Sequence, residues 1–393
     1  MSVARATFLV GMASALAMAV GLTTSASPVA ASAGAASGRA GRAGDAALGR
    51  ALARLVRQAD GPPGAAVIVQ RDGRLVLYRA GTANLATGAP IAASDSMRLA
   101  SVSKAFSGAV ALSLVADGRL SLRETVGQRL RGLPRAWSKV TLRELLQHTS
   151  GIPDFSATKA FRKALLKSLR KAPPPRVLLS FARKRLTFTP GSRYKYSNSD
   201  NVIVALMTEA ATGKSYVTGL HRRVFAPLGL RHTSLPRGVG IPAPIVHGYD
   251  VTPPEQPVDV SHLFAAGWAW ASGGIVSTPR DANAFIRGYV RGATTSTTVR
   301  RAQFTFRRGS SEPPGPGVNS AGLAIFRYQT RCGTMYGHTG NTAGYTQFVA
   351  ASKSGKRSVV VTVNSQLSPT IHPDRFRELR HIYTLAACAA LAR

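Results

Sequence analysis

A long apolar segment from Ala105 to Ala116 stands out in the first half of the chain. It is apolar on nearly every side, which predicts a helix buried in the core. The Asp117-Gly118 pair predicts where that helix ends. A second apolar run at 202–207 predicts a helix that ends near Gly213, and the pattern at 373–391 predicts a C-terminal helix.

Runs rich in β-forming residues lie near both ends of the chain. Residues 65–69 and 75–78 flank a turn signal and predict a hairpin. Residues 345–351 and 357–363, divided by a short polar segment, predict another. Strands at both ends with helices between them predict an α+β fold, in which an antiparallel sheet from both termini is flanked by helices.

Ser101 lies just before the predicted buried helix and forms a Ser-x-x-Lys motif with Lys104. This spacing occurs four times in the sequence, so it is weak alone, but the other three copies lie in a stretch dominated by Lys and Arg. Residues three apart share a helix face. A lysine there is partly desolvated, which lowers its pKa and makes the neutral amine accessible. A solvated lysine beside a capping serine is the alternative.

Two later motifs supply further polar groups. Tyr196-Ser197-Asn198 precedes the apolar run at 202–207, so we expect it on a loop just before a helix. His338-Thr339-Gly340 precedes the second hairpin and is expected on or beside an edge strand, where glycine lets a substrate backbone approach. Each motif alone also fits an ordinary turn or a glycine-rich loop.

Together and in this order, the three motifs resemble those of penicillin-recognising serine hydrolases. The branch concerned contains class C β-lactamases, D-alanyl-D-alanine carboxypeptidases and related esterases. The resemblance runs from about residue 48 to the C-terminus and implies a β-lactamase/transpeptidase-like fold with an inserted, mostly helical region at roughly 120–270. Further similar segments occur in family order at 145–153, 191–198, 225–230 and 271–278.

The resemblance implies the catalytic roles. Ser101 is the acylated nucleophile, and Lys104 and Tyr196 move protons. Which of these two is the general base stays open. The backbone N–H groups of Ser101 and Asn341 form the oxyanion hole.

The resemblance also implies the substrate contacts. Asn198 holds the substrate amide, and His338 and Thr339, beside Gly340, meet the substrate carboxylate. If His338 must be cationic for this, affinity should fall as the pH rises through the imidazole pKa, nominally about 6.5.

The implied activity is that of a D-alanyl-D-alanine carboxypeptidase that acts on peptidoglycan-type peptides and reacts with penicillins through an acyl-enzyme. Most β-lactamases of the superfamily carry lysine at the position of His338, so slow turnover of penicillins is expected. A class C-like β-lactamase, an esterase and a D-amino-acid amidase are alternatives on the same scaffold, and a non-catalytic cell-wall-binding protein is a remote one. We expect no cofactor and no metal, because the eight histidines are scattered without a His-Glu-x-x-His motif.

The N-terminus predicts export. Residues 1–33 contain a basic start, an apolar stretch and an Ala-Ser-Ala cleavage site, which are typical of a signal peptide. Residues 34–49, rich in Ala, Gly, Ser and Arg, predict a disordered linker. Residues 50–393 remain as the catalytic domain, secreted to the bacterial cell-wall space, without a transmembrane anchor and expected as a monomer.

The two cysteines agree with export. Cys332 lies six positions before His338, and Cys388 lies in the predicted C-terminal helix. An even count in a secreted protein predicts a disulfide. Two unpaired buried thiols are the alternative.

The charge is strongly basic, with 51 Lys and Arg against 17 Asp and Glu and a net charge of +34. Residues 155–199 contain no acid. Lys159, Lys163, Lys167 and Lys171 recur every four residues, which predicts a helix with one cationic face. For an exported protein, anionic cell-wall polymer or lipid headgroups are more suitable partners than nucleic acid, and a solvated basic surface without a partner is the alternative.

Overall fold

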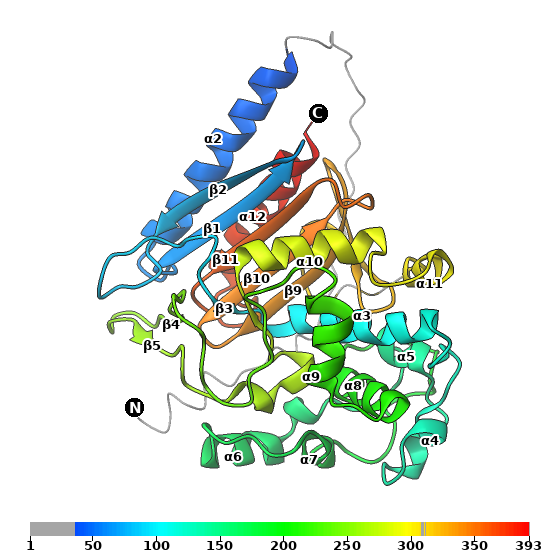
Figure 1. The fold of residues 1–393 in the computed structure, drawn as a ribbon. Helices are drawn as coiled ribbons and strands as arrows, with labels where there is room; N and C mark the ends of the chain where they lie inside the picture. The colour runs from blue at the N-terminus through cyan, green and yellow to red at the C-terminus, as the bar shows by residue number, and fades with distance from the viewer. Residues whose placement is uncertain (1–35, 308–309, 311, 393) are drawn as a thin grey trace.

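The protein is described by a computed structural model over residues 36–307, 310 and 312–392. Its centre is a seven-stranded antiparallel sheet in the order β2-β1-β11-β10-β9-β8-β7 (Figure 1). Two strands come from the N-terminal part and five from the C-terminal part, which confirms the predicted α+β fold. The strands are β1 (Gly64–Arg71), β2 (Arg74–Gly81), β7 (Val318–Ala321), β8 (Phe326–Thr330), β9 (Gly333–Thr342), β10 (Tyr345–Ala351) and β11 (Ser358–Val363).

Both predicted hairpins are present. β1 and β2 are joined at Asp72 and Gly73, whose φ angles of 50° and 77° are those that a two-residue type I′ turn requires. β10 and β11 pair with Thr346 opposite Val363. The turn chemistry therefore sets the register of these strands as the sequence indicates.

Both faces of the sheet are buried. Along β1, Val67 and Val69 pack into one core, and Ile68 packs into the other. Helices α2 (Ala36–Arg57) and α12 (Pro373–Leu391) cover the first face. Helix α10 (Pro279–Arg291) packs against β10 and β11 on the second face, and the rest of the helical region extends from that side (Figure 1).

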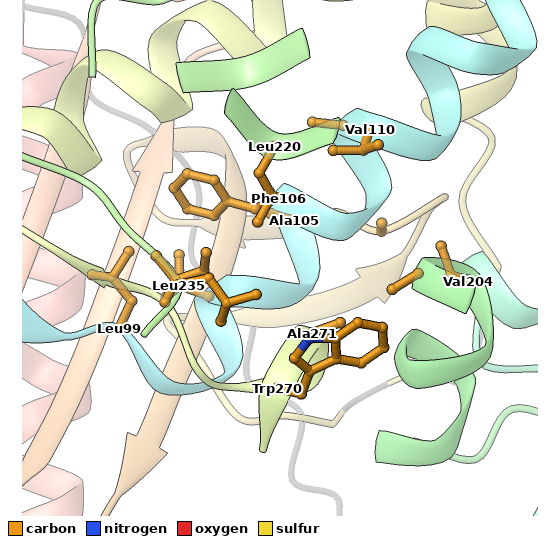
Figure 2. Close-up of a cluster of buried hydrophobic side chains, with 14 of the residues drawn as sticks. Leu99, Ala105, Phe106, Val110, Val204, Leu220, Leu235, Trp270 and Ala271 are labelled. Atoms are coloured by element: carbon orange, nitrogen blue, oxygen red, sulfur yellow. The ribbon is translucent and has the colours of Figure 1, made fainter. Parts of the chain in front are cut away.

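Helix α3 (Ser103–Ala116) is the buried helix that the sequence predicts. Twelve of its fourteen residues are buried, from Ser103 to Leu114. Figure 2 shows Phe106 and Val110 of this helix in one apolar cluster with Val204 and Leu220. Because α3 is enclosed on all sides, its first turn is held rigidly against the sheet.

The region between α3 and β6 consists of short helices joined by long loops, and two small two-stranded sheets lie within it or at its ends. No helix in the described part of the chain is long and apolar enough to cross a membrane. The α-helices here and just after are α4 (Val126–Arg129), α5 (Leu142–Leu146), α6 (Lys159–Lys167), α7 (Pro175–Ser180), α8 (Asn198–Thr212), α9 (Tyr216–Leu220) and α11 (Thr297–Gln303). The short strands are β3 (Met97–Arg98) with β6 (Val276–Ser277), and β4 (Tyr249–Asp250) with β5 (Val258–Asp259). The 3-10 turns are η1 (Ala100–Val102), η2 (Arg135–Trp137), η3 (Phe155–Ala157), η5 (Ala266–Trp268) and η6 (Trp270–Ser272), and η4 (His221–Phe225) is a π-helical turn.

The N-terminal segment differs from the prediction. Residues 36–49, expected as part of a disordered linker, form the first turns of α2. Alanine is the strongest helix former, and Leu48, Leu52 and Leu55 of this helix are buried against the sheet and α12. The predicted signal peptide at 1–33 lies outside the described residues.

The chain's first and last described helices meet at one side chain. Arg71 pairs with Asp45 of α2 at 2.8 Å and donates to the Ala389 carbonyl of α12 at 2.8 Å. The two helices therefore lie side by side on the outer face of the sheet.

Strand β9 is interior in the sheet order, but part of it is a local edge. β8 pairs with β9 only from Gly333 to Gly337, so His338 to Asn341 have β10 as their partner strand on one side alone. β9 is therefore not the edge strand that was expected, but the His-Thr-Gly motif lies on the part of it that has no partner strand on one side. The other side of the strand faces the start of α3.

Candidate active site

Ser101 lies in a tight turn between β3 and α3. Ala100 has a φ of 48°, a conformation that residues other than glycine rarely adopt. The Ser103 hydroxyl donates to the Ala100 carbonyl at 2.7 Å and accepts from the Ile275 N–H at 3.0 Å. These bonds hold the strained turn in place and fix the position of Ser101.

Gly340 lets β9 lie against this turn. A Cβ atom at Gly340 would come within 2.2 Å of the Leu99 carbonyl oxygen and 3.2 Å of the Ala100 side chain. No larger residue fits without moving the backbone. The glycine of the third motif thus sets the distance between β9 and the Ser101 turn.

Lys104 is buried beside Ser101. Its side chain is 1 % exposed, and its Nζ lies 3.0 Å from Ser101 Oγ and 2.7 Å from the Ser272 carbonyl oxygen. Burial lowers the pKa of the amine to about 7, and the charge of Asp154 opposes part of this shift. A large fraction of Lys104 is therefore neutral near pH 7 and can accept a proton from Ser101.

Tyr196 lies on the other side of the amine. Lys104 Nζ is 4.8 Å from the centre of the tyrosine ring. Burial raises the pKa of the Tyr196 phenol well above its ordinary value. The nearby Ser101 side chain opposes part of this shift, although the phenol oxygen has no hydrogen-bond partner among the described residues. The phenol therefore keeps its proton. This arrangement suits Tyr196 as a proton donor and Lys104 as the base.

Asn198 begins α8 and is oriented by two polar neighbours. Its Nδ2 donates to Asp154 Oδ2 and to Ser156 Oγ, both at 2.9 Å. Both amide hydrogens are engaged, so the amide oxygen is the atom left to accept a bond from a substrate N–H.

A buried polar cluster below Tyr196 was not predicted as part of the site. His148 Nδ1 lies 2.9 Å from Asp200 Oδ2, and the Ser150 hydroxyl donates to Asp200 Oδ1 at 2.6 Å. The His148 ring is 4.5 Å from the Tyr196 ring, centre to centre. The signal in the sequence was an acid two positions after Asn198 at the start of an apolar helix, where a buried carboxyl needs a partner.

The Asp200 carboxyl and the His148 imidazole are both uncharged in this cluster. Burial raises the pKa of the Asp200 carboxyl and lowers that of the His148 imidazole. Both shifts favour the neutral forms, so one proton lies between the two side chains. The cluster supports Tyr196 from below at little electrostatic cost to Lys104.

His338 lies below the cavity and does not line it. Its Nδ1 contacts the Thr339 carbonyl oxygen at 2.5 Å, and burial lowers its pKa to about 3. The imidazole is therefore neutral near pH 7, and it cannot supply the positive charge that the pH-dependent carboxylate clamp requires. Its neighbours are the rings of Tyr196 and Phe326, at 6.3 and 5.0 Å.

A cavity of about 100 Å³ opens at Ser101. Among its described lining residues, Glu312 is the one acid, and no lysine, arginine or histidine is present. Burial raises the pKa of the Glu312 carboxyl, and Lys195 opposes the shift. The lining comprises Ala100, Ser101, Tyr196, Asn198, Ala269, Ser272, Gly273, Glu312, Pro313, Pro314, Thr339, Gly340, Asn341, Thr342, Thr346, Pro369, Phe376 and Tyr383.

Most of the predicted site residues converge on this cavity. Ser101, Tyr196, Asn198 and the β9 residues 339–341 line it, and Lys104 lies directly behind Ser101. Ser101 and Asn341, whose N–H groups were predicted to form the oxyanion hole, both face the same space. In the described part of the chain, no group of three or more His, Cys, Asp or Glu side chains is placed to hold a metal ion.

The predicted disulfide joins Cys332 and Cys388. Cys332 immediately precedes β9, and Cys388 lies in the last turn of α12. The bond therefore links the strand that lines the cavity to the helix that contributes Phe376 and Tyr383 to it.

Comparison with known proteins agrees with this geometry. The sequence model of the Beta-lactamase family matches residues 52–384. A D-aminopeptidase of Brucella anthropi is 34% identical over 193 residues, 47% of this chain and 35% of that protein. Penicillin-binding protein 4* of Bacillus subtilis (strain 168) is 29% identical over 170 residues, 42% of this chain and 37% of that protein. The matched segments thus span about a third of the length of these curated relatives.

A solved structure extends the match over the whole fold. The D-stereospecific amidohydrolase from Streptomyces sp. superposes with a TM-score of 0.74 at 27% identity, covering 85% of this chain and 98% of that one. Fold and site together define a serine hydrolase of the β-lactamase/transpeptidase type. The chain belongs to the Beta-lactamase family.

Proposed function

We propose that the protein hydrolyses amides of D-amino acids that carry a free amino group, through an acyl-enzyme on Ser101. The observation that carries the chemistry is the buried Lys104 amine, 3.0 Å from Ser101 Oγ with a pKa of about 7. Neutral Lys104 takes the Ser101 proton as Oγ attacks the substrate carbonyl. Tyr196 donates its proton to the leaving nitrogen, and the C–N bond breaks. Water then attacks the acyl-Ser101 ester and gives a proton to the Tyr196 phenolate. Lys104 returns its proton to Ser101 Oγ as the acid product leaves.

The charge of the cavity favours an amino-ended substrate. Glu312 is an acid, which suits an ammonium group, whereas a carboxypeptidase needs a cation for the substrate carboxylate. The described lining contains no lysine or arginine, and His338 is neutral. The names of the Brucella and Streptomyces proteins support the same choice. D-alanyl-D-alanine carboxypeptidase activity with penicillin acylation is the second candidate, favoured by the similarity to penicillin-binding protein 4*.

A substrate panel tests the choice. D-phenylalanine amide, its N-acetyl derivative and diacetyl-Lys-D-Ala-D-Ala would be compared with wild type, Ser101→Ala and Glu312→Gln. We expect hydrolysis of the free amine alone, none with Ser101→Ala, and a KM raised about tenfold by Glu312→Gln. Faster cleavage of the D-Ala-D-Ala peptide, unaffected by Glu312→Gln, would establish the second candidate instead.

Intact-mass spectrometry tests the intermediate. After incubation with penicillin and with a D-amino acid ester, a mass increase should map to Ser101. An adduct on another residue, or hydrolysis that persists in Ser101→Ala, would contradict the acyl-enzyme.

We also propose export, because the sequence of residues 1–33 is typical of a signal peptide. The full-length chain, expressed in a bacterium, should be recovered from the culture medium with a new N-terminus near residue 34. Recovery from the cell interior with an intact N-terminus would contradict export.

A further inference from the structure

A second cavity lies in the helical region, away from Ser101. It has a volume of about 550 Å³ and is formed by the loop at 132–136 and by α7 with the segment after it. In Figure 1, α7 lies at the end of the molecule opposite β2. The lining residues are Gly132, Leu133, Pro134, Arg135, Ala136, Arg176, Leu179, Ser180, Ala182, Lys184 and Arg185.

The cavity concentrates positive charge. Arg135, Arg176, Lys184 and Arg185 are all exposed around it, and its described lining includes no acid. None of the four makes an ion pair with a carboxylate in the part of the chain that the structure describes. Like charges brought together without counter-ions raise the potential inside a concave surface, which favours an anionic ligand.

Arg176 and the floor of the cavity have structural support. Arg176 donates to the Arg131 carbonyl at 2.9 Å and so connects α7 to the facing loop. Leu179 and Ala182 are buried beneath the rim and give the cavity an apolar floor. Arg176 and the floor of the cavity are therefore fixed by the packed fold.

We propose that this cavity binds a flexible phosphodiester polymer of small polyols, of the poly(glycerol phosphate) kind. Arginine and lysine contact the phosphates, and the apolar floor accepts the CH₂ groups between them. Single-stranded nucleic acid fits less well, because its binding sites stack bases on aromatic side chains, and the described lining of this cavity includes no aromatic residue. This inference goes beyond the proposed amide hydrolysis and does not depend on it.

Helix α6 carries the cationic face that the sequence predicted, and it packs beside this part of the fold, with the Phe161 ring 5.9 Å from the ring of Phe181, which follows α7. Helix α6 has Lys159, Lys163 and Lys167 exposed, with Phe161 and Leu165 buried, as its spacing predicts. Lys171 lies beyond the end of the helix. A chain longer than the cavity has further cations to meet on this surface, so the affinity should rise with polymer length.

The test uses the purified protein and synthetic poly(glycerol phosphate). The cavity variant is R135Q/K184Q/R185Q, which leaves Arg176 and its structural hydrogen bond intact. The matched control is R50Q/R74Q/R331Q, which removes the same charge from exposed positions outside the cavity. Binding is measured by titration calorimetry at several salt concentrations, and circular dichroism and amide hydrolysis check that each variant is folded.

The wild-type affinity should fall with salt, and the cavity variant should bind about tenfold or more weakly with a shallower salt slope. The control should stay within about twofold of wild type. Equal losses in both variants would overturn the proposal, because binding would then follow net charge alone. Tighter binding of oligodeoxythymidine or of anionic lipid vesicles, with the same dependence on the cavity, would also overturn it in favour of those partners. Amide hydrolysis should be unchanged in both variants, so failure here leaves the proposed function standing.

Discussion

At the scale of single residues, the chemistry depends on the desolvation of the Lys104 amine. The amine bonds to Ser101 Oγ and to the Ser272 carbonyl, and the side chain is otherwise enclosed. This enclosure is what brings the pKa of Lys104 down to about 7. A base with that pKa is about half free of its proton at pH 7.

Removing the amine should abolish turnover. For wild type, the acid limb of the kcat/KM profile for amide hydrolysis should have its midpoint near pH 7, because only neutral Lys104 can act as the base. Lys104→Met should lower kcat/KM about a thousandfold, and Lys104→Arg should do the same, since arginine keeps its proton. A pH profile without an acid limb, or an active Lys104→Arg, would argue against this role.

Replacing the Asp200 carboxyl group with an amide should be tolerated, whereas removing the group should not. In Asp200→Asn, the new amide can donate to His148 Nδ1 while its oxygen accepts from Ser150, so this variant should retain activity within about threefold. Asp200→Ala leaves these partners unsatisfied and should cost about 1–3 kcal/mol in the free energy of unfolding. Urea unfolding and kcat/KM measure both effects. An Asp200→Asn variant as damaged as Asp200→Ala would show that the pair is charged.

Even the smallest substitution at Gly340 should reduce activity. In Gly340→Ala the new methyl meets the Leu99 carbonyl at 2.2 Å, so β9 must move away from Ser101. We expect kcat/KM to fall about a hundredfold. Gly49→Ala is the matched control, because no described atom lies within 4 Å of its Cβ position in α2, and it should leave activity unchanged. Equal activity of the two variants would contradict the close approach.

At the scale of helices and strands, local patterns predicted most of the fold. The all-round apolar run gave α3, the turn residues gave both hairpins, and the cysteine count gave the disulfide, since each depends on neighbours in sequence or on composition. The linker prediction at 36–49 was wrong because composition alone does not show that Leu48 has α12 to pack against. The roles of His148, Asp200 and neutral His338 depend on burial by distant segments, which no spacing reveals.

The disulfide should matter for stability more than for chemistry. It closes a loop with a sequence separation of 56, so Cys332→Ser/Cys388→Ser should lose about 4 kcal/mol in the free energy of unfolding. Urea titration of the variant and of wild type measures this loss. Because the bond anchors α12, KM should rise more than kcat falls. Unchanged stability would show that packing alone holds α12 on the sheet.

At the scale of the whole molecule, the net charge of +34 acts against compactness. Raising NaCl from about 0.05 to 0.5 M screens this repulsion, so Tm should rise by roughly 2 °C or more. Thermal denaturation followed by circular dichroism measures the effect. A Tm that falls with salt would mean that favourable ion pairs outweigh the repulsion between like charges.

The meeting of α2 and α12 at Arg71 has a consequence for engineering. A short designed loop joining residue 392 to residue 44 would close the polypeptide into a ring without disturbing the sheet, and new ends could be opened in the exposed segment at 86–88. Such a circular permutant would keep every strand in its register. It would also move the points of fusion to a second protein from the outer helices to the exposed segment at 86–88.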